Sequence, residues 1–226
     1  MQSKMAVKIG IDLAMTAALL LLMAYSLIGE AAHEWIGIAM LVLFLTHHIL
    51  NCSWHRNLLK GRYTPLRIWQ TVLVAAVLLS MAGSMVSGIV LSRHALAFLP
   101  ISGGQSWART LHLLCAYWGL VVMSLHLGFH WSMMMGFAKK AFPASSKARA
   151  WLLRLLAVGT AGYGAFAFWK RQIGSYLFLQ SEFVFFNFEE PLIFFFLDYL
   201  AVMALFVCIG HYIAQLLRQK NRKGKA

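Results

Sequence analysis

Six long apolar runs limit what this chain can fold into more than any other feature. A transmembrane α-helix needs about 20 mostly apolar residues, and the runs cover approximately residues 8–29, 32–52, 68–92, 110–138, 151–169 and 191–217. Hydrophobic residues make up 61% of the 226 residues and charged residues only 12%, whereas about 25% of a soluble domain is charged. The sequence therefore predicts an all-α integral membrane protein with six transmembrane helices in a lipid bilayer.

The basic residues predict the orientation of these helices. One side of the predicted membrane carries 16 of the 20 Lys and Arg residues: Lys4, Lys8, Arg56, Lys60, Arg62, Arg67, Lys139, Lys140, Lys147, Arg149, Arg154, Arg218, Lys220, Arg222, Lys223 and Lys225. The other side carries Arg93, Arg109, Lys170 and Arg171. Since Lys and Arg accumulate in cytoplasmic loops, we expect a multi-pass protein of the cytoplasmic membrane with both termini cytoplasmic. Topology thus explains the net charge of +13, and no nucleic-acid binding is expected.

The first apolar run has two interpretations. Lys4 and Lys8 precede it and the sequence Glu30-Ala31-Ala32 follows it, an arrangement that is compatible with a cleaved signal peptide. However, its apolar length of about 20 residues exceeds the roughly 7–15 residues typical of the apolar region of such a peptide. We therefore favour a retained helix.

Four histidines in the second and fourth runs share one spacing. His33 and His47 lie 14 residues apart, and so do His112 and His126. On an α-helix, 14 residues correspond to roughly 21 Å of axial rise and nearly four whole turns, so each helix would hold two imidazoles on nearly the same face. The predicted topology makes the two helices parallel. His33 and His112 would therefore share the outer level of the membrane, and His47 and His126 the inner level.

Histidines inside membrane helices are functional candidates, because an unpaired imidazole in hydrocarbon costs free energy. Neutral imidazole binds iron, copper and zinc, but zinc requires a compact set of four ligands, and the two levels are about four turns apart. Cys52, Cys115 and Cys208 form no CxxC or CxxCH motif, which disfavours covalent haem and clustered iron–sulfur or zinc sites. Haem b fits better, because it brings four nitrogens and needs only two protein ligands.

The sequence thus predicts two haem b groups in a four-helix bundle core formed by residues 1–140. Residues 141–226 would add two further transmembrane helices. The predicted iron ligands are His33 with His112 for the outer haem, and His47 with His126 for the inner haem. Two protein ligands per iron leave no open position for oxygen.

One other histidine competes for the inner ligand position. His130 lies one turn beyond His126 on the same stripe, and we prefer His126 because its spacing from His112 matches that in the second run. We expect packing for His48, cytoplasmic solvent contact for His55 and a structural role for His211. The sequence leaves the role of His94 open, with a hydrogen bond to a quinone or a haem propionate as one option.

Glycines and arginines near these histidines are further candidates for cofactor binding. Gly37 and Gly119 would let a flat macrocycle approach the backbone, although close packing between helices explains them equally well. Arg93 and Arg109 stand at the outer level and could pair with the anionic haem propionates. The positions of both arginines are explained equally well without haem, because basic residues commonly lie at the ends of membrane helices.

A segment between the fifth and sixth runs is rich in aromatic residues. Residues 172–190 include Tyr176, Phe178, Phe183, Phe185, Phe186 and Phe188. We expect an interfacial segment that lies along the outer membrane surface, where aromatic side chains are enriched. A lid or a docking surface for an outer partner is the alternative.

The chain resembles the flavinylation-associated cytochrome family over about residues 8–136. The resemblance is carried by His33-Glu34-Trp35-Ile36-Gly37, His47-His48-Ile49-Leu50-Asn51, Ser87-Gly88-Ile89-Val90-Leu91-Ser92-Arg93 and, after His112, His126-Leu127-Gly128-Phe129-His130-Trp131. It implies a membrane b-type cytochrome that moves electrons across the membrane to an extracytoplasmic flavin-bearing protein. The histidine spacing is also similar to that of respiratory cytochrome b and of ferric-reductase-like membrane domains.

The residues and the resemblance lead to one main hypothesis of function. We expect an electron-transfer membrane subunit of oxidoreductase type, which carries electrons from a quinol or a cytoplasmic-side donor to an extracytoplasmic flavoprotein or ferric acceptor. The alternative is a proton or transition-metal transporter that uses the histidines without haem. It would require acidic or other polar groups along its path, and the second to fourth runs have no acid at mid-membrane. A haem-free assembly subunit is disfavoured by the intact set of four histidines.

Overall fold

The computed structural model describes residues 2–141 and 146–223. Within these residues the protein is all-helical, and six helices are long and apolar enough to cross a membrane. These are α1 (Gln2–Met23), α3 (Glu30–Leu50), α5 (Pro65–Leu91), α6 (Gln105–Ala141), α7 (Lys147–Lys170) and α9 (Leu192–Lys223). The all-α class and the six candidate spans are therefore confirmed. Lys225, one of the basic residues of the predicted cytoplasmic tail, lies outside the described residues.

The long helices are joined partly by three short ones, namely α2 (Tyr25–Ile28), α4 (Cys52–Arg56) and α8 (Ile173–Leu177). The first apolar run breaks at Ala24 between α1 and α2, which the sequence did not predict. Gly29 then adopts a φ of 89°, a conformation that glycine reaches without steric cost, and the chain turns directly into α3. This tight connection makes α1 and α3 an antiparallel pair.

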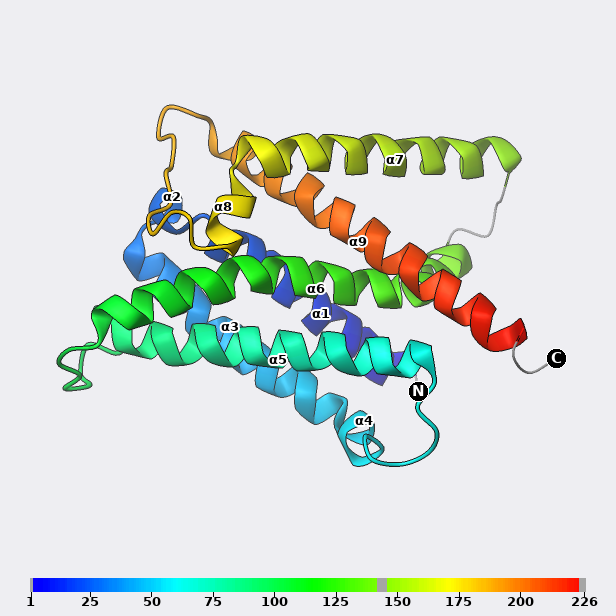
Figure 1. Ribbon diagram of the computed structural model, residues 1–226, viewed down its shortest axis with the longest axis horizontal. Coiled ribbons are helices and arrows are strands. Elements are labelled where there is room, and N and C mark those ends of the chain that lie inside the picture. Colours follow the sequence, from blue (N-terminus) through cyan, green and yellow to red (C-terminus); the bar gives the residue numbers. More distant parts are fainter. Residues whose placement is uncertain (1, 142–145, 224–226) are drawn as a thin grey trace.

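The direction of the helices is visible in Figure 1. The N-terminal end of α1, the C-terminal end of α9 and the short helix α4 lie at one end of the bundle, and α2 and α8 lie at the other. Both α3 and α6 run from the α2 end toward the α4 end, so these two helices are parallel. The first histidine of each predicted pair is therefore at the α2 end, and the second is at the α4 end. We call these the outer end and the inner end.

Helix α6 is the centre of the bundle and is longer than predicted. It has 37 residues and begins at Gln105 instead of near residue 110, so it extends about 55 Å at ~1.5 Å per residue. Because the hydrocarbon core of a bilayer is only about 30 Å thick, α6 must tilt or project beyond it. Helix α6 packs against α5 on one side and α9 on the other.

Glycines allow α9 to approach its neighbours closely. A Cβ added at Gly128 of α6 would collide with the carbonyl group of Val207, and one added at Gly210 of α9 would collide with the carbonyl of Leu125. Gly164 of α7 meets the backbone of α9 in the same way. Small residues that bring two backbones together are a common basis of helix association in membranes. These contacts hold α6, α7 and α9 together as one side of the bundle.

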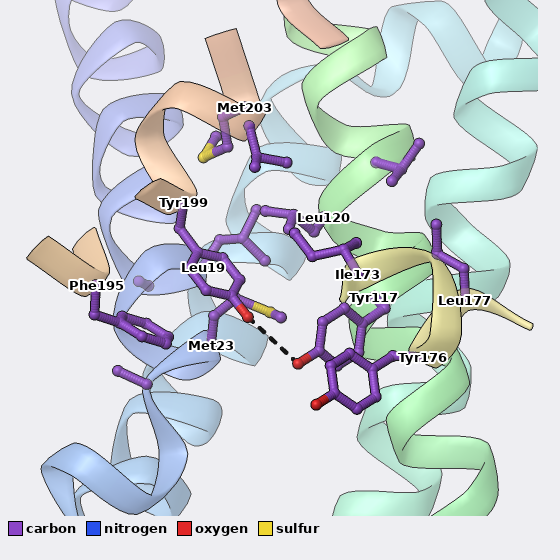
Figure 2. Close-up of a cluster of buried hydrophobic side chains, with 14 of the residues drawn as sticks. Leu19, Met23, Tyr117, Leu120, Ile173, Tyr176, Leu177, Phe195, Tyr199 and Met203 are labelled. Carbon is purple, nitrogen blue, oxygen red and sulfur yellow. Dashed lines mark hydrogen bonds between the residues drawn. The ribbon is translucent and has the colours of Figure 1, made fainter. Parts of the chain in front are cut away.

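The main core lies where α1, α6, α8 and α9 meet (Figure 2). Tyr117 of α6 stacks on Tyr176 of α8 with ring centroids 4.6 Å apart, and its hydroxyl lies 3.3 Å from that of Tyr199 of α9. Helix α3 contributes only one fully buried side chain to this core, that of Met40. The helix that carries His33 and His47 is therefore the least covered part of the predicted site.

The aromatic segment after α7 is divided between core and surface. Ile173, Tyr176 and Leu177 of α8 are buried, and Trp118 of α6 donates a hydrogen bond to the Leu177 carbonyl at 2.9 Å. The exposed aromatic residues of the segment are Phe178, Phe183, Phe185 and Phe188. The first part of the segment thus folds back into the bundle. The following loop presents most of its aromatic side chains outward, but Phe186 packs against Phe195 of α9 with ring centroids 6.0 Å apart.

A network of charged groups fixes this segment to α7 and α9. The buried carboxylate of Asp198 accepts hydrogen bonds from Tyr163, Lys170 at 2.9 Å and Arg171 at 2.8 Å. Arg171 also pairs with Glu190 at 2.7 Å. Burial by itself would lower the pKa of Arg171, but its hydrogen bonds and ion pairs with Glu190 and Asp198 raise that pKa above its usual value. The charges in the network balance, as a buried ionic cluster requires.

Candidate paired-histidine sites

The outer histidines of α3 and α6 face one another. The ring centroids of His33 and His112 are 6.0 Å apart, with an angle of 66° between the rings. Two imidazoles on opposite sides of one metal ion have centroids about 6 Å apart, because each imidazole–metal bond is about 2 Å long and the ring centre lies about 1 Å beyond the nitrogen. The observed separation therefore has the right size for a single ion between the two rings.

Helix α5 orients the ring of His112. The Nδ1 atom of His112 lies 3.1 Å from the carbonyl oxygen of Ser84 and 3.1 Å from the hydroxyl of Ser87. A carbonyl oxygen only accepts hydrogen bonds, so this contact favours the tautomer with the proton on Nδ1. The lone pair is then on Nε2, which is the arrangement that second-shell partners give to histidine ligands of metals. Sequence reasoning named Ser87 only as part of a motif and did not name Ser84.

The carboxylate of Glu34 holds α3 against the end of α5. It accepts hydrogen bonds from the hydroxyl of Ser92 at 2.7 Å and from three successive backbone N–H groups, those of Arg93 at 2.8 Å, His94 at 2.9 Å and Ala95 at 2.7 Å. Successive N–H groups of this kind form a concave binding site for an anion. Since Glu34 is adjacent to His33, this contact fixes the height and rotation of α3 at the outer pair. Sequence reasoning missed this role of Glu34.

The ring of His33 has fewer partners than that of His112. The ring of Tyr25 meets it edge-on at 5.0 Å between centroids. Its Nδ1 atom is buried and has no hydrogen-bond partner among the described residues. His33 therefore lacks, at this atom, the kind of second-shell contact that orients the ring of His112.

Polar side chains surround the outer end of this pair. Tyr25 donates a hydrogen bond to Glu30 at 2.7 Å, and burial together with this bond raises the pKa of Tyr25 to about 12. Arg93 and Arg109 are exposed and lie within electrostatic range of Tyr25. Both predicted arginines are thus at the end of the bundle that carries the outer pair. The ring of His94 lies 3.8 Å from Glu30.

The inner site begins with a contact between α1 and α3. The Nδ1 atom of His47 lies 2.7 Å from a carboxylate oxygen of Asp12. Asn51 donates a hydrogen bond to the His47 carbonyl at 2.8 Å, and Lys8 donates one to Asn51 at 3.0 Å. His47 is thereby fixed through both its ring and its backbone, with Nε2 left for a ligand. Sequence reasoning did not pair Asp12 with His47.

The other half of the inner site is formed by histidines of α6, and in the part of the chain that the structure describes these do not contact the histidine of α3 as they do at the outer pair. His126 and His130 have ring centroids 4.9 Å apart. Among the described residues, no ring contact joins His47 to either of them, although both lie within electrostatic range of His47 and Asp12. The Nδ1 atom of His126 is buried without a hydrogen-bond partner in the same part of the chain. The structure thus brings the predicted ligand and its rival into one cluster.

The remaining histidines lie apart from these clusters or on their margin. His48 bonds through Nδ1 to Nε2 of His55 at 2.9 Å, so its ring is engaged by α4. His211 of α9 has a buried Nδ1 without a hydrogen-bond partner in the described ranges, and its backbone lies where α9 approaches Gly128. The ring of His48 also meets that of its neighbour His47 edge-on, with centroids 5.6 Å apart, whereas no ring contact joins His211 to a histidine of α3 or α6 in the described residues.

The two predicted glycines have different surroundings. A Cβ added at Gly37 would meet no heavy atom of the described residues within 4 Å, so space is open on this side of α3. A Cβ added at Gly119 would lie 3.7 Å from the side chain of Ser80, so Gly119 faces α5. Open space at Gly37 is compatible with a flat cofactor, and the surroundings of Gly119 correspond to helix packing.

The available donor set fits haem better than a metal ion bound by protein alone. In the part of the chain that the structure describes, no group of three or more His, Cys, Asp or Glu side chains could hold a metal ion. Haem iron needs only a pair of protein ligands, and in each predicted pair one imidazole, that of His112 or that of His47, has its Nδ1 engaged by another group. Comparison of the chain with protein-family models, with curated proteins and with solved structures gave no match.

Proposed function

We propose that this protein is a membrane b-type cytochrome, similar to the flavinylation-associated cytochromes, that carries electrons across the cytoplasmic membrane through two bis-histidine haems. The observation that carries the proposal is the outer pair, in which His33 and His112 face each other at 6.0 Å and the Nδ1 of His112 is engaged by α5. At the inner level, the contact between Nδ1 of His47 and the Asp12 carboxylate, which leaves Nε2 for a ligand, also supports the proposal.

Each residue of the sites has a defined task in this proposal. His33 and His112 hold the outer haem, and His47 and His126 hold the inner one, with His130 as the rival inner ligand. Ser84 keeps a proton on Nδ1 of His112 and directs Nε2 inward. Each bound haem supplies a one-electron carrier with no open coordination position. Arg93 and Arg109 offer charge for the propionates at the outer end.

The proposed direction of transfer is outward. With both termini cytoplasmic, as the basic residues indicate, the inner site is near a quinol or a cytoplasmic-side donor and the outer site near an extracytoplasmic flavoprotein or ferric acceptor. A membrane potential contributes ~2.3 kcal/mol per electron for each 100 mV crossed. With a negative cytoplasmic side, this contribution favours outward transfer.

A transporter that uses histidines for protons or a transition metal is the second candidate. One observation favours it, namely that Asp12 places a carboxylate beside His47 at the inner end. The outer pair has no equivalent, because the nearby carboxylate of Glu34 is fully engaged by Ser92 and the backbone of residues 93–95. Among the described residues, a carboxylate thus contacts the ring of a predicted ligand histidine at the inner end and not at the outer pair.

Transfer across sealed vesicles tests the function. The purified protein, reconstituted in liposomes that contain ferricyanide, should reduce the entrapped ferricyanide when a membrane-impermeant reductant is added outside. His112→Ala should abolish this reaction because it removes a ligand of the outer haem. His48→Ala is the matched control and should retain it, since His48 is bonded to His55. An internal pH change or metal uptake without ferricyanide reduction would identify the protein as a transporter instead.

A further inference from the structure

The two proposed ligand pairs differ in the chemistry of the groups behind them. At the outer pair, the Nδ1 of His112 meets two neutral groups, the Ser84 carbonyl and the Ser87 hydroxyl, each at 3.1 Å. At the inner site, the Nδ1 of His47 meets the carboxylate of Asp12 at 2.7 Å. The inner histidine therefore has a shorter contact to a group that can carry a full negative charge.

The surroundings of Asp12 show that His47 is the partner of its side chain. Lys8, one turn before it on α1, bonds to Asn51 instead, and Thr16 bonds to the backbone carbonyl of Asp12. In the described part of the chain, His47 is thus the hydrogen-bonding partner found for the Asp12 carboxylate. Because an acid within an apolar span is costly unless it is paired, this contact accounts for the position of Asp12.

A carboxylate behind a ligating imidazole has two effects. It fixes the proton on the nitrogen that it contacts and so aims the other nitrogen at the metal, and it raises the basicity of the ligand. A more basic ligand donates more electron density and stabilises the oxidised iron relative to the reduced iron. The reduction potential of the bound haem is thereby lowered.

We propose that Asp12 is a positioning residue for the inner haem, which aims Nε2 of His47 at the iron and lowers the reduction potential of that haem below the value that a neutral partner would give. The inference rests on the proposed function. It concerns the inner haem alone, since the corresponding groups at the outer pair are neutral. A lowered inner potential favours transfer from the inner to the outer haem, in agreement with the proposed outward direction.

Redox titration of the purified protein tests the role of Asp12. The haem lost in His47→Ala identifies which potential belongs to the inner site. Asp12→Asn and Asp12→Ser should each raise that potential and leave the other unchanged, whereas Asp12→Glu, which keeps the carboxylate, should remain close to the unsubstituted protein. Thr16→Val is the matched control, because it alters the same turn of α1 without removing the carboxylate, and it should leave both potentials unchanged.

The outcomes separate this inference from the proposed function. Selective loss of the inner haem in both neutral variants, with retention in Asp12→Glu, would also support it, since the carboxylate is then required to position His47. Neutral variants that keep both haems with an unchanged inner potential would overturn it, as would Asp12→Glu shifting that potential as much as Asp12→Asn. Absence of haem from the unsubstituted protein would refute the proposed function itself.

Discussion

Replacement of His112 by alanine is expected to reduce the haem content from two per chain to one. His33 would then face no second imidazole, and the described structure offers no other histidine ring in contact with it. His33→Ala should give the same result, because each iron needs both ligands. The measurement is pyridine haemochrome quantification, normalised to protein, together with a redox titration that should retain a single potential.

A buried histidine outside the two pairs provides the control for this prediction. His211 of α9 also has a buried Nδ1 without a hydrogen-bond partner among the described residues, so His211→Ala makes a comparable change in the apolar interior. It should retain both haems. If His112→Ala kept two haems, or if His211→Ala lost one, the assignment of the outer pair would be wrong.

The second large effect is expected at the inner end of α6. His126→Ala should remove the inner haem and spare the outer one, whereas His130→Ala should retain both. The 14-residue spacing from His112 places His126 at the depth of His47, and His130 lies about one further turn toward the inner end. Haem quantification and the identity of the remaining potential distinguish the two variants. The reverse result would make His130 the ligand and would place the inner haem nearer to the α4 end of the bundle.

Sequence reasoning succeeded where local physical chemistry decides the outcome. The lengths of the apolar runs predicted six helices because backbone groups in a bilayer must be satisfied within the helix, and the described residues contain six such helices. The exact ends were less predictable. The break at Ala24 and the early start of α6 at Gln105 depend on turns and loops outside the membrane core, where hydropathy gives little information.

Contacts between distant residues were not predictable from the sequence. Asp12 and His47 are 35 residues apart, and Glu34 and His94 are 60 apart, so only the packing of α1 and α5 around α3 brings each pair together. One signal was nevertheless present. An acid in the first apolar run and another beside His33 each need a partner in the membrane, and histidines or a free run of backbone N–H groups are the natural candidates.

The visible spectrum of the purified protein tests the central claim most directly. After expression with sufficient haem, the reduced-minus-oxidised spectrum should show b-type bands, and pyridine haemochrome quantification should give two haems per chain. A colourless protein, or one whose haem content stays at zero under these conditions, would contradict the paired-histidine account.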